Sequence, residues 1–298
     1  MEHFGHKGLR LEQAGDKATL QEQQKALYLI LEEFDRVCRL LQTPYVLFAG
    51  TLIGAVRHQG FVPWDDDIDV LMMREDYERF LEQAPALLDG ENFFLQKEFS
   101  PHWPLFFSKL RLNGTACLET YHPKDKKSHQ GLYMDIFPCD NARESKLGQY
   151  LQFFSSKVVI AKGLDRRGYE ATFKKKAFMI LCRLLPGRPF HRITRGPKKQ
   201  GNFVHSFFGA ASRFSKNVYP SACFRERMLL QFEQGMFPAP ADYDRLLTIA
   251  YGDYMSLPTE DEQKCKRHSI LVDLTRSYED YENYRDGMKF DILTRSIR

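Results

Sequence analysis

The sequence lacks any long apolar run, which argues against a membrane-spanning helix. Such a helix needs about 20 consecutive apolar residues. The longest apolar-dominated run, Tyr45–Val56, is interrupted by Gly50, Thr51 and Gly54. The first fifteen residues also lack the apolar stretch of a signal peptide. We therefore expect residues 1–18 to form a flexible N-terminus.

Closely spaced cysteines and glycine-rich nucleotide motifs are also missing. The six cysteines are far apart and form no C-x-x-C, which argues against a structural zinc site and a secreted disulfide framework. We therefore expect reduced thiols and a cytoplasmic protein. No G-x-x-x-x-G-K-[ST] or G-x-G-x-x-G occurs, so P-loop and Rossmann interpretations lack support.

What is present is an ordinary globular composition with an uneven charge distribution. The chain has 298 residues, 43% hydrophobic and 28% charged, which excludes disordered and fibrous classes and allows a sizeable core. The net charge is only +4, yet residues 157–200 contain 13 Lys or Arg and two acidic residues. This basic segment favours an anionic partner or a solvated helix face. The weak overall charge and the acidic remainder argue against nucleic acid as the partner.

Periodicity divides the chain near residue 140. Thr19 and Glu22 form a capping-box pattern before a helix over 20–41. Before residue 140 we further expect helices over 52–57 and 74–84, extended segments over 45–49, 68–72, 93–99 and 132–137, and a hairpin of 105–112 with 115–119 around Asn113-Gly114. Beyond it we expect helices over 145–162, 170–185, 204–214 and 242–250, with loops at 163–168 and 186–201. The expected architecture is α+β, with a mixed α/β core over 19–140 and a mainly helical region over 141–298.

The most informative stretch is Trp64–Val70, which holds four aspartates in five positions. Carboxylates so close repel one another unless a cation lies among them. In a strand, Asp65, Asp67 and Asp69 would share one face. Hard oxygen ligands suit Mg²⁺ or Mn²⁺, whereas the EF-hand pattern fails. The alternative is an acidic surface turn.

Two further features strengthen a catalytic interpretation. Asp135 lies among apolar strand residues, where an isolated charge is costly. It would act as a third ligand or as a base, or else as an ordinary strand-end residue. Gly50-Thr51 follows a strand and precedes a short helix, an arrangement that admits a phosphate to free backbone amides.

Together these motifs resemble the nucleotidyltransferase superfamily and, more narrowly, its LicD family of phosphocholine-type transferases, which is related to the fukutin-like transferases. The resemblance rests on Ala49–His58 with Gly60–Asp69, on Gly131–Pro138, and on Tyr251–Met255 with Leu257-Pro258. One departure is Ala49, where these proteins more often show a second glycine. The resemblance implies a nucleotidyltransferase-like mixed sheet with flanking helices.

For activity, the resemblance implies Mg²⁺-dependent transfer of a phospho-alcohol from a CDP-linked donor such as CDP-choline. The acceptor would be a hydroxyl of a cell-surface glycan, such as a lipopolysaccharide or teichoic acid, or its lipid-linked precursor, and CMP would be released. Asp67, Asp69 and Asp135 would be catalytic and, with Asp65, would bind the metal. Donor contacts are expected from Gly50, Thr51, Arg57, His58, Trp64, Lys109, Arg111 and His268.

Several of these assignments have alternatives. Trp64 would wedge the turn rather than stack on cytosine, and Lys109 and Arg111 would otherwise form an exposed cationic strand face. A choline group would need an aromatic box, for which the candidates are Trp103, Phe106, Phe107, Tyr133, Tyr251 and Tyr254. A basic amphipathic helix within 157–200 would contact an anionic membrane at its inner face or dock on the protein. A cytidylyltransferase making a CDP-alcohol from CTP, and a non-catalytic module that binds anionic lipid or glycan, are the rival functions.

Overall fold

The fold was analysed in a computed structural model, which describes residues 17–119, 127–167, 173–208, 213–259 and 269–281. The first of its helices, α2 (Leu20–Leu41), has the expected bounds and the expected capping box between Thr19 and Glu22. Its buried residues include Leu27, Ile30 and Phe34, which recur at helical spacing. The sequence prediction for this helix is confirmed.

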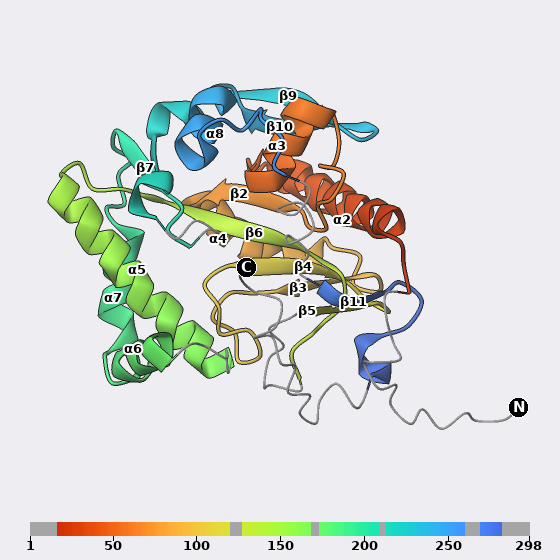
Figure 1. The fold of residues 1–298 in the computed structure, drawn as a ribbon, viewed down its shortest axis with the longest axis horizontal. Helices are drawn as coiled ribbons and strands as arrows, with labels where there is room; N and C mark the ends of the chain where they lie inside the picture. The colour runs from red at the N-terminus through yellow and green to blue at the C-terminus, as the bar shows by residue number, and fades with distance from the viewer. Residues whose placement is uncertain (1–16, 120–126, 168–172, 209–212, 260–268, 282–298) are drawn as a thin grey trace, which may run out of the picture.

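A mixed sheet forms the centre of the molecule (Figure 1). Its main path runs in the order β1 (Val46–Leu47), β2 (Asp69–Met73), β6 (Tyr133–Asn141), β4 (Ser108–Leu112) and β3 (Phe93–Gln96). Strands β2 and β6 are parallel and the other pairs on this path are antiparallel. β7 (Phe203–His205) pairs with the end of β6, and β8 (Val218–Pro220) pairs with β7.

Strand β6 continues through Pro138, where the sequence predicted that it would stop. Pro138 pairs with Met72 of β2. The antiparallel partner on the other side, β4, is in register with β6 only from Tyr133 to Ile136. Proline therefore lies where one side of β6 has no ladder partner, a position that tolerates its missing N–H. Beyond it, Asp140 and Asn141 pair with β7.

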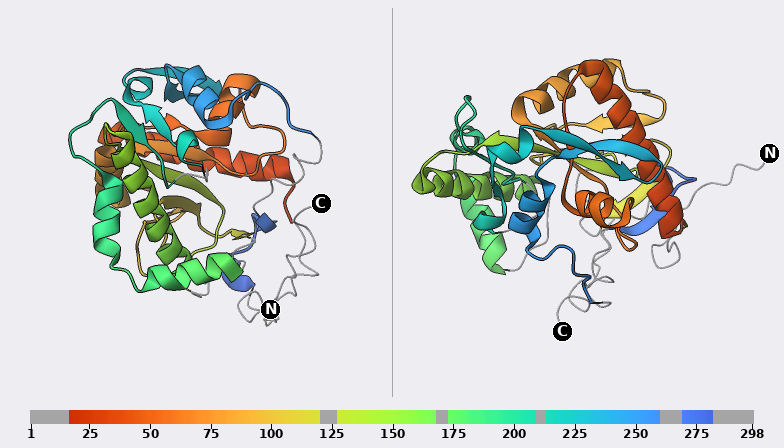
Figure 2. Two further views of the ribbon diagram at one scale, coloured as in Figure 1. Left: turned by 60° about the vertical axis from the view of Figure 1, so that its left-hand side comes forward. Right: turned by 90° about the horizontal axis from the view of Figure 1, so that it is seen from above.

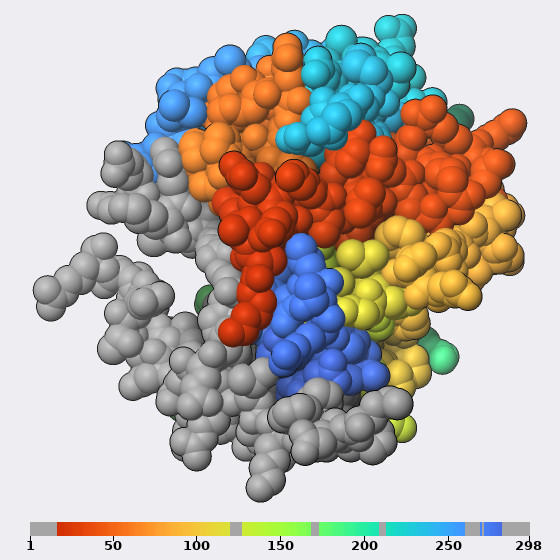
Figure 3. Space-filling view, turned by 90° about the vertical axis from the view of Figure 1, so that its right-hand side faces the viewer, coloured from red at the N-terminus to blue at the C-terminus, as the bar shows by residue number. Residues whose placement is uncertain are grey.

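The expected hairpin around Asn113-Gly114 is wrong. The turn is present, with φ +67° at Gly114, but β5 (Ala116–Glu119) pairs with β11 (Ser269–Asp273) and not with β4. Gln130 and Leu132 accept backbone hydrogen bonds from Cys117 and Leu112, and so take the place of direct pairing between the two strands. Figure 3 shows the start of α2 beside the segment 269–281, where the Lys17 amide bonds to the Val272 carbonyl.

Helices cover the sheet and one of its ends. α3 (Ala49–His58) follows β1, and α4 (Arg74–Gln83) with a 3₁₀ turn (Ala84–Ala86) follows β2. α5 (Lys146–Arg167), α6 (Phe173–Arg183) and α7 (Gly187–Arg195) lie together at the end of the sheet that carries β7, away from α2 (Figures 1 and 2). The predicted loops at 163–168 and 186–201 are therefore partly helical, since α5 extends to Arg167 and α7 occupies the second segment.

The region after residue 195 departs most from the prediction of a mainly helical C-terminal half. The predicted helix over 204–214 is wrong because β7 lies there. A hairpin of β9 (Arg227–Phe232) and β10 (Gly235–Pro240) follows, with short 3₁₀ turns at Phe214–Lys216, Ser221–Phe224 and Tyr278–Asp280. Helix α8 (Tyr243–Tyr251) does form near the predicted bounds and ends at Gly252, whose φ is +80°.

One hydrophobic core contains residues from both sides of residue 140, including Phe34, Ile136, Phe232 and Leu247. None of the helices in the described ranges is long and apolar enough to cross a membrane. The five described cysteines, Cys38, Cys117, Cys139, Cys182 and Cys223, are buried free thiols.

Candidate active site

Asp69 and Asp135 lie side by side on the central parallel strands. The register of β2 and β6 pairs Asp69 directly with Asp135. Residues opposite each other in a ladder project from the same face of the sheet, and adjacent strands are about 4.8 Å apart. The fold thus brings together carboxylates that are 66 positions apart in the sequence.

The turn between β1 and α3 holds this pair from one side. Thr51 lies in the first turn of α3, and its hydroxyl oxygen accepts a 2.8 Å hydrogen bond from the Asp69 amide. Gly50 lies against Asp65, since a Cβ at Gly50 would be only 2.4 Å from Asp65 Oδ2. Ala49, the position of the family's second glycine, has φ +47°, a left-handed conformation that glycine adopts at no steric cost.

The acidic run is not a continuous strand. Residues 65–68 are irregular and β2 begins only at Asp69, so the strict alternation that we expected does not extend to Asp65 and Asp67. Asp66 is buried and accepts a 3.0 Å hydrogen bond from the Ser269 hydroxyl. The Gln23 and Gln24 side chains bond to the Asp66 and Asp65 carbonyls. α2 and β11 therefore fix the backbone of the acidic loop.

Burial and nearby negative charge raise the pKa of both paired carboxylates. Burial raises the pKa of Asp69 well above its usual range, and the negative charges of Asp67, Asp135 and Asp65 raise it further. Burial also raises the pKa of Asp135, against the opposing effect of Lys109. Asp69 therefore lies in a strongly negative environment, which would favour a bound cation.

Lys109 is the internal counter-ion of this cluster. Its Nζ lies 3.0 Å from Asp135 Oδ1 and 3.2 Å from Glu119 Oε1, and it also lies over the Tyr133 ring. Arg111 donates hydrogen bonds to Gln96 Oε1 and the Gly131 carbonyl. Lys109 and Arg111 are each about 1% exposed, so the alternative of an exposed cationic strand face is wrong. Both are bound to protein groups instead of facing a ligand cavity.

The described residues contain no group of three or more His, Cys, Asp or Glu side chains arranged to hold a metal ion on their own. The donor set nevertheless fits Mg²⁺, which usually binds one or two carboxylates and completes its shell with substrate phosphates and water. Asp135 Oδ1 is buried, and the described group nearest to neutralising it is the Lys109 ammonium, 3.0 Å away.

A cavity of about 510 Å³ opens beside Asp69. Two cations line it, Arg213 and Lys216, and neither was predicted from the sequence. Tyr251 also lines the cavity and is 44% exposed, while enclosure of its hydroxyl and then the negative charge of Asp69 raise its pKa. The other lining residues are mostly apolar or aromatic: Phe48, Ala49, Phe137, Asn217, Tyr219 and Ala250.

Arg213 and Lys216 were missed because they belong to the weakly patterned region after residue 200. The signal available in the sequence was their spacing of three residues near Phe214 and Tyr219, which also fits an exposed helix. Only the pairing of β7 with β6 and of β8 with β7 brings this segment to the edge of the acidic cluster.

Three predicted donor residues lie together outside this cavity. Arg57 donates to the Tyr254 and Ser256 carbonyls and to His58 Nε2. His58 contacts Trp64 edge to face, with ring centroids 6.4 Å apart. This group joins the end of α3 to the segment after α8. His268 lies outside the described residues.

The six aromatic residues predicted as candidates for a choline box do not lie together. Trp103, Phe107 and Tyr133 surround the ammonium of Lys109, at 5.3, 5.6 and 3.0 Å from the ring centroids, so an internal cation already fills that cage. Phe106 stacks on Phe208, and the Tyr254 hydroxyl donates to Asp244. Of the six candidates, Tyr251 lines the cavity beside Asp69.

Comparison with known proteins finds a family model that covers the aspartates of this site. Residues 42–155 match the family model described as the LicD/FKTN/FKRP nucleotidyltransferase domain, which includes Asp65–Asp69 and Asp135. The chain is 29% identical over 259 residues to the lipopolysaccharide cholinephosphotransferase LicD of Haemophilus influenzae, and the match covers 83% of this chain and 96% of that protein.

A shorter match, 35% identical over 124 residues, is to an uncharacterized protein of Rickettsia typhi and covers 41% of this chain and 37% of that protein. Another, 41% identical over 51 residues, is to an uncharacterized protein of Rickettsia prowazekii, with 17% and 19% of the two chains covered. The sequence motifs, the match of residues 42–155 and the likeness over most of the chain agree with one another, and residues 42–155 are similar to the nucleotidyltransferase domain of the LicD family.

Proposed function

We propose that this enzyme transfers a phospho-alcohol, in the first instance phosphocholine, from a CDP-linked donor to a hydroxyl of a lipopolysaccharide or a related cell-surface glycan. The acceptor oxygen forms a bond to the β-phosphorus of the donor, the bond from that phosphorus to the bridging oxygen breaks, and CMP leaves. The acceptor loses its proton. The observation that carries the proposal is the pairing of Asp69 with Asp135 beside a cavity that also holds Arg213 and Lys216.

In this proposal Asp67 and Asp69, with Asp65 close by, would hold Mg²⁺, which would supply positive charge to the diphosphate of the donor. The guanidinium of Arg213 and the ammonium of Lys216, which line the same cavity as Asp69, bind donor phosphate oxygens. The first turn of α3, with Gly50 and Thr51, offers backbone amides to the same anion. Two cationic side chains and a helix N-terminus thus serve the reacting phosphate.

Asp135 has two candidate roles, a further metal ligand and the base that removes the acceptor proton. A raised pKa suits a base, because proton transfer is most efficient near the working pH. The ion pair with Lys109 suits a residue held in a fixed orientation. In the Asp135→Asn variant, metal affinity measured by Mn²⁺ titration distinguishes the two, since only the loss of a ligand weakens it.

The choline head group is proposed to bind the aromatic lining of the same cavity. A quaternary ammonium is attracted to the faces of aromatic rings, and Phe48, Phe137, Tyr219 and Tyr251 are available there. The cage of Trp103, Phe107 and Tyr133 is excluded from this role because Lys109 occupies it. Tyr251→Ala should therefore raise KM for CDP-choline more than for CDP-glycerol.

The test is product analysis. The protein is incubated with Mg²⁺, lipopolysaccharide and CDP-choline, CDP-ribitol or CDP-glycerol, and CMP is measured. Asp67→Asn and Asp69→Asn should abolish CMP release while keeping the wild-type circular dichroism spectrum. Full activity in both variants contradicts the assignment. Pyrophosphate formed from CTP and choline phosphate would instead identify the cytidylyltransferase alternative.

We also propose that the enzyme works at the inner face of the membrane and contacts it through residues 157–200. α6 supports this location because its buried residues are only Met179 and Cys182. Its outer residues Phe173, Ile180 and Leu181 are exposed, Phe173 by 87%, and so is Leu184, which directly follows the helix. An exposed apolar face flanked by lysines is typical of helices that lie in the membrane interface.

A further inference from the structure

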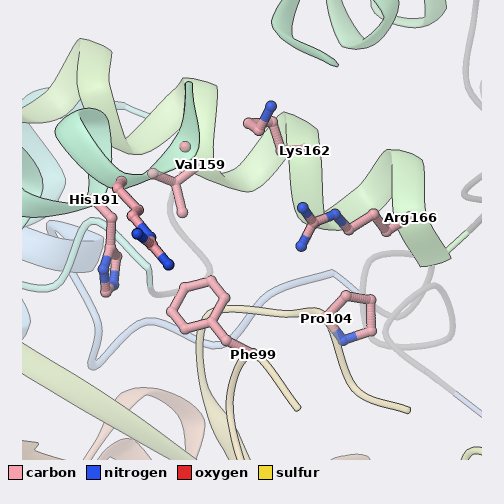
Figure 4. Close-up of a pocket in the computed structure, with 9 residues that line it drawn as sticks. Phe99, Pro104, Val159, Lys162, Arg166 and His191 are labelled. Atoms are coloured by element: carbon pink, nitrogen blue, oxygen red, sulfur yellow. The ribbon is translucent and has the colours of Figure 1, made fainter. Parts of the chain in front are cut away.

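A second cavity, of about 640 Å³, lies between α5, the start of α7 and the segment that contains Phe99 and Pro104 (Figure 4). It shares no lining residue with the cavity beside Asp69. Its wall is contributed by Val159, Gly163, Arg166, Gly187 and Arg188, among others. The proposed phospho-transfer leaves this cavity without a role.

The cavity is lined by positive charge that no acidic side chain in the described part of the chain neutralises. Arg166 and Arg188 are exposed, and neither has an acidic partner among the described residues. In Figure 4 the Arg166 side chain projects above Pro104 into the cavity. Helix α7 begins here at Gly187 with no side-chain cap, so its first amides and the positive end of its dipole add to the two guanidinium groups.

Lys162 serves a different purpose, although it also lines the cavity. Its Nζ donates hydrogen bonds to the Cys182, Arg183 and Leu185 carbonyls, at 3.1, 3.1 and 2.6 Å. It therefore caps the C-terminus of α6, and Figure 4 shows it pointing away from Phe99. Lys162 thereby fixes α6 next to the cavity.

One side of the cavity has an unused hydrogen-bonding group and an apolar surface. His191 Nε2 is buried and has no hydrogen-bond partner among the described residues. Burial lowers the pKa of His191 to about 4, so the ring is neutral at pH 7, and in one tautomer it donates from Nε2. Phe99 lies edge to face against the His191 ring, at 4.7 Å between centroids, and Pro104 and Val159 extend the apolar wall.

We propose that this cavity binds the phosphate group of a membrane-borne anionic amphiphile, whose apolar part lies along the outer face of α6. Two arginines and a helix N-terminus are the groups that proteins use for phosphate. α6 joins the cavity to the exposed apolar residues because it packs on α5 through Met179 and Cys182 against Val158 and Ala161. Its Lys174, Lys175 and Lys176 are exposed to the same anionic surface.

The binding itself is independent of the catalytic step. The phosphate bound here would hold a lipid-linked acceptor in front of the Asp69 cavity. This second part of the inference rests on the proposed function. A phosphate on the acceptor and a phosphate on a neighbouring membrane lipid have the same chemistry, and the cavity recognises that chemistry.

The probe is dihexanoyl phosphatidic acid, kept below its aggregation concentration and titrated calorimetrically into the full chain. Wild type should bind it, and inorganic phosphate should compete. The double variant Arg166→Gln/Arg188→Gln should bind about ten to a hundred times more weakly, since two charge-assisted contacts are lost. The matched control is Arg225→Gln, which removes an exposed arginine next to the β9–β10 hairpin and should bind like wild type.

A sedimentation experiment with vesicles tests the contribution of the apolar face separately from that of the phosphate site. Leu181→Ser/Leu184→Ser should reduce sedimentation with phosphatidylcholine vesicles that contain phosphatidic acid, yet leave competition by inorganic phosphate unchanged. The proposal is overturned if the double arginine variant binds phosphatidic acid as tightly as wild type does. It is also overturned if Arg225→Gln loses as much affinity as the double variant, or if wild type binds dihexanoyl phosphatidylcholine as tightly as dihexanoyl phosphatidic acid. Asp69→Asn should lose CMP release but keep phosphatidic acid binding, so failure of the proposed function and failure of this inference give different results.

Discussion

Gly50→Ala should damage the active site without damaging the fold. The new Cβ would lie 2.4 Å from Asp65 Oδ2, whereas ordinary contacts begin near 3.4 Å. The Asp65 carboxylate must therefore retreat by about 1 Å, and a displacement of that size in a catalytic arrangement costs roughly a hundredfold in rate. The free energy of unfolding should change by less than about 1 kcal/mol, since the displaced group is the end of a rotatable side chain and alanine favours the helix.

Activity is measured as CMP release from CDP-choline, and the free energy of unfolding is measured by urea unfolding of the same preparation. Gly90→Ala is the matched control, because a Cβ at Gly90 would meet no atom within 4 Å, and it should keep both activity and stability. Wild-type activity in Gly50→Ala would show that the position of Asp65 does not matter for the reaction. A large loss of stability would refute the view that this contact is local.

Three further substitutions test the electrostatics of the site. Asp69→Asn should stabilise the metal-free protein by about 1 kcal/mol or more at pH 7, because it removes repulsion among clustered carboxylates; a lower Tm than wild type without Mg²⁺ would contradict this. Glu119→Gln should destabilise the protein at pH 7. Lys109 and the two arginines Arg111 and Arg167 overcome the effect of burial and lower the pKa of Glu119 below its ordinary value of 4.5, so its contribution is present above pH 4.5 and is lost as the pH falls further. Urea unfolding at pH 7 and pH 3 measures the difference between the two proteins, which should shrink at pH 3. Arg213→Gln should lower kcat/KM for the CDP-linked donor about ten to a hundredfold, and an unchanged value would remove Arg213 from the phosphate site.

The sequence predicted the elements that local rules determine. The capping box of Thr19 and Glu22 defines the start of α2, and Gly252 marks the end of α8. The strand positions of Asp69 and Asp135 followed from apolar neighbours on both sides of a carboxylate. Their direct pairing depends on the parallel register of β2 and β6, which joins distant segments and cannot be read from either one.

The errors arose where non-local contacts overrule local preference. Asn113-Gly114 makes a turn, but β11 competes successfully for β5. Pro138 is tolerated because β4 has already ended. Lys109 and Arg111 are consecutive alternate residues of β4, but they are buried against Glu119 and Gln96 and do not form the exposed cationic face that was the alternative. Arg213 and Lys216 reach the site only through the added strands β7 and β8.

The hydrogen bond between Ser269 and Asp66 has a consequence for synthesis of the protein in the cell. It joins residues 203 positions apart, so the acidic loop cannot acquire this contact until β11 has left the ribosome. Domains fold as they emerge during translation, and contacts of high sequence separation form late. A nascent chain that ends before β11 would therefore carry β2 and β6 but not the finished acidic loop, and this loop would reach its final conformation only when translation is nearly complete.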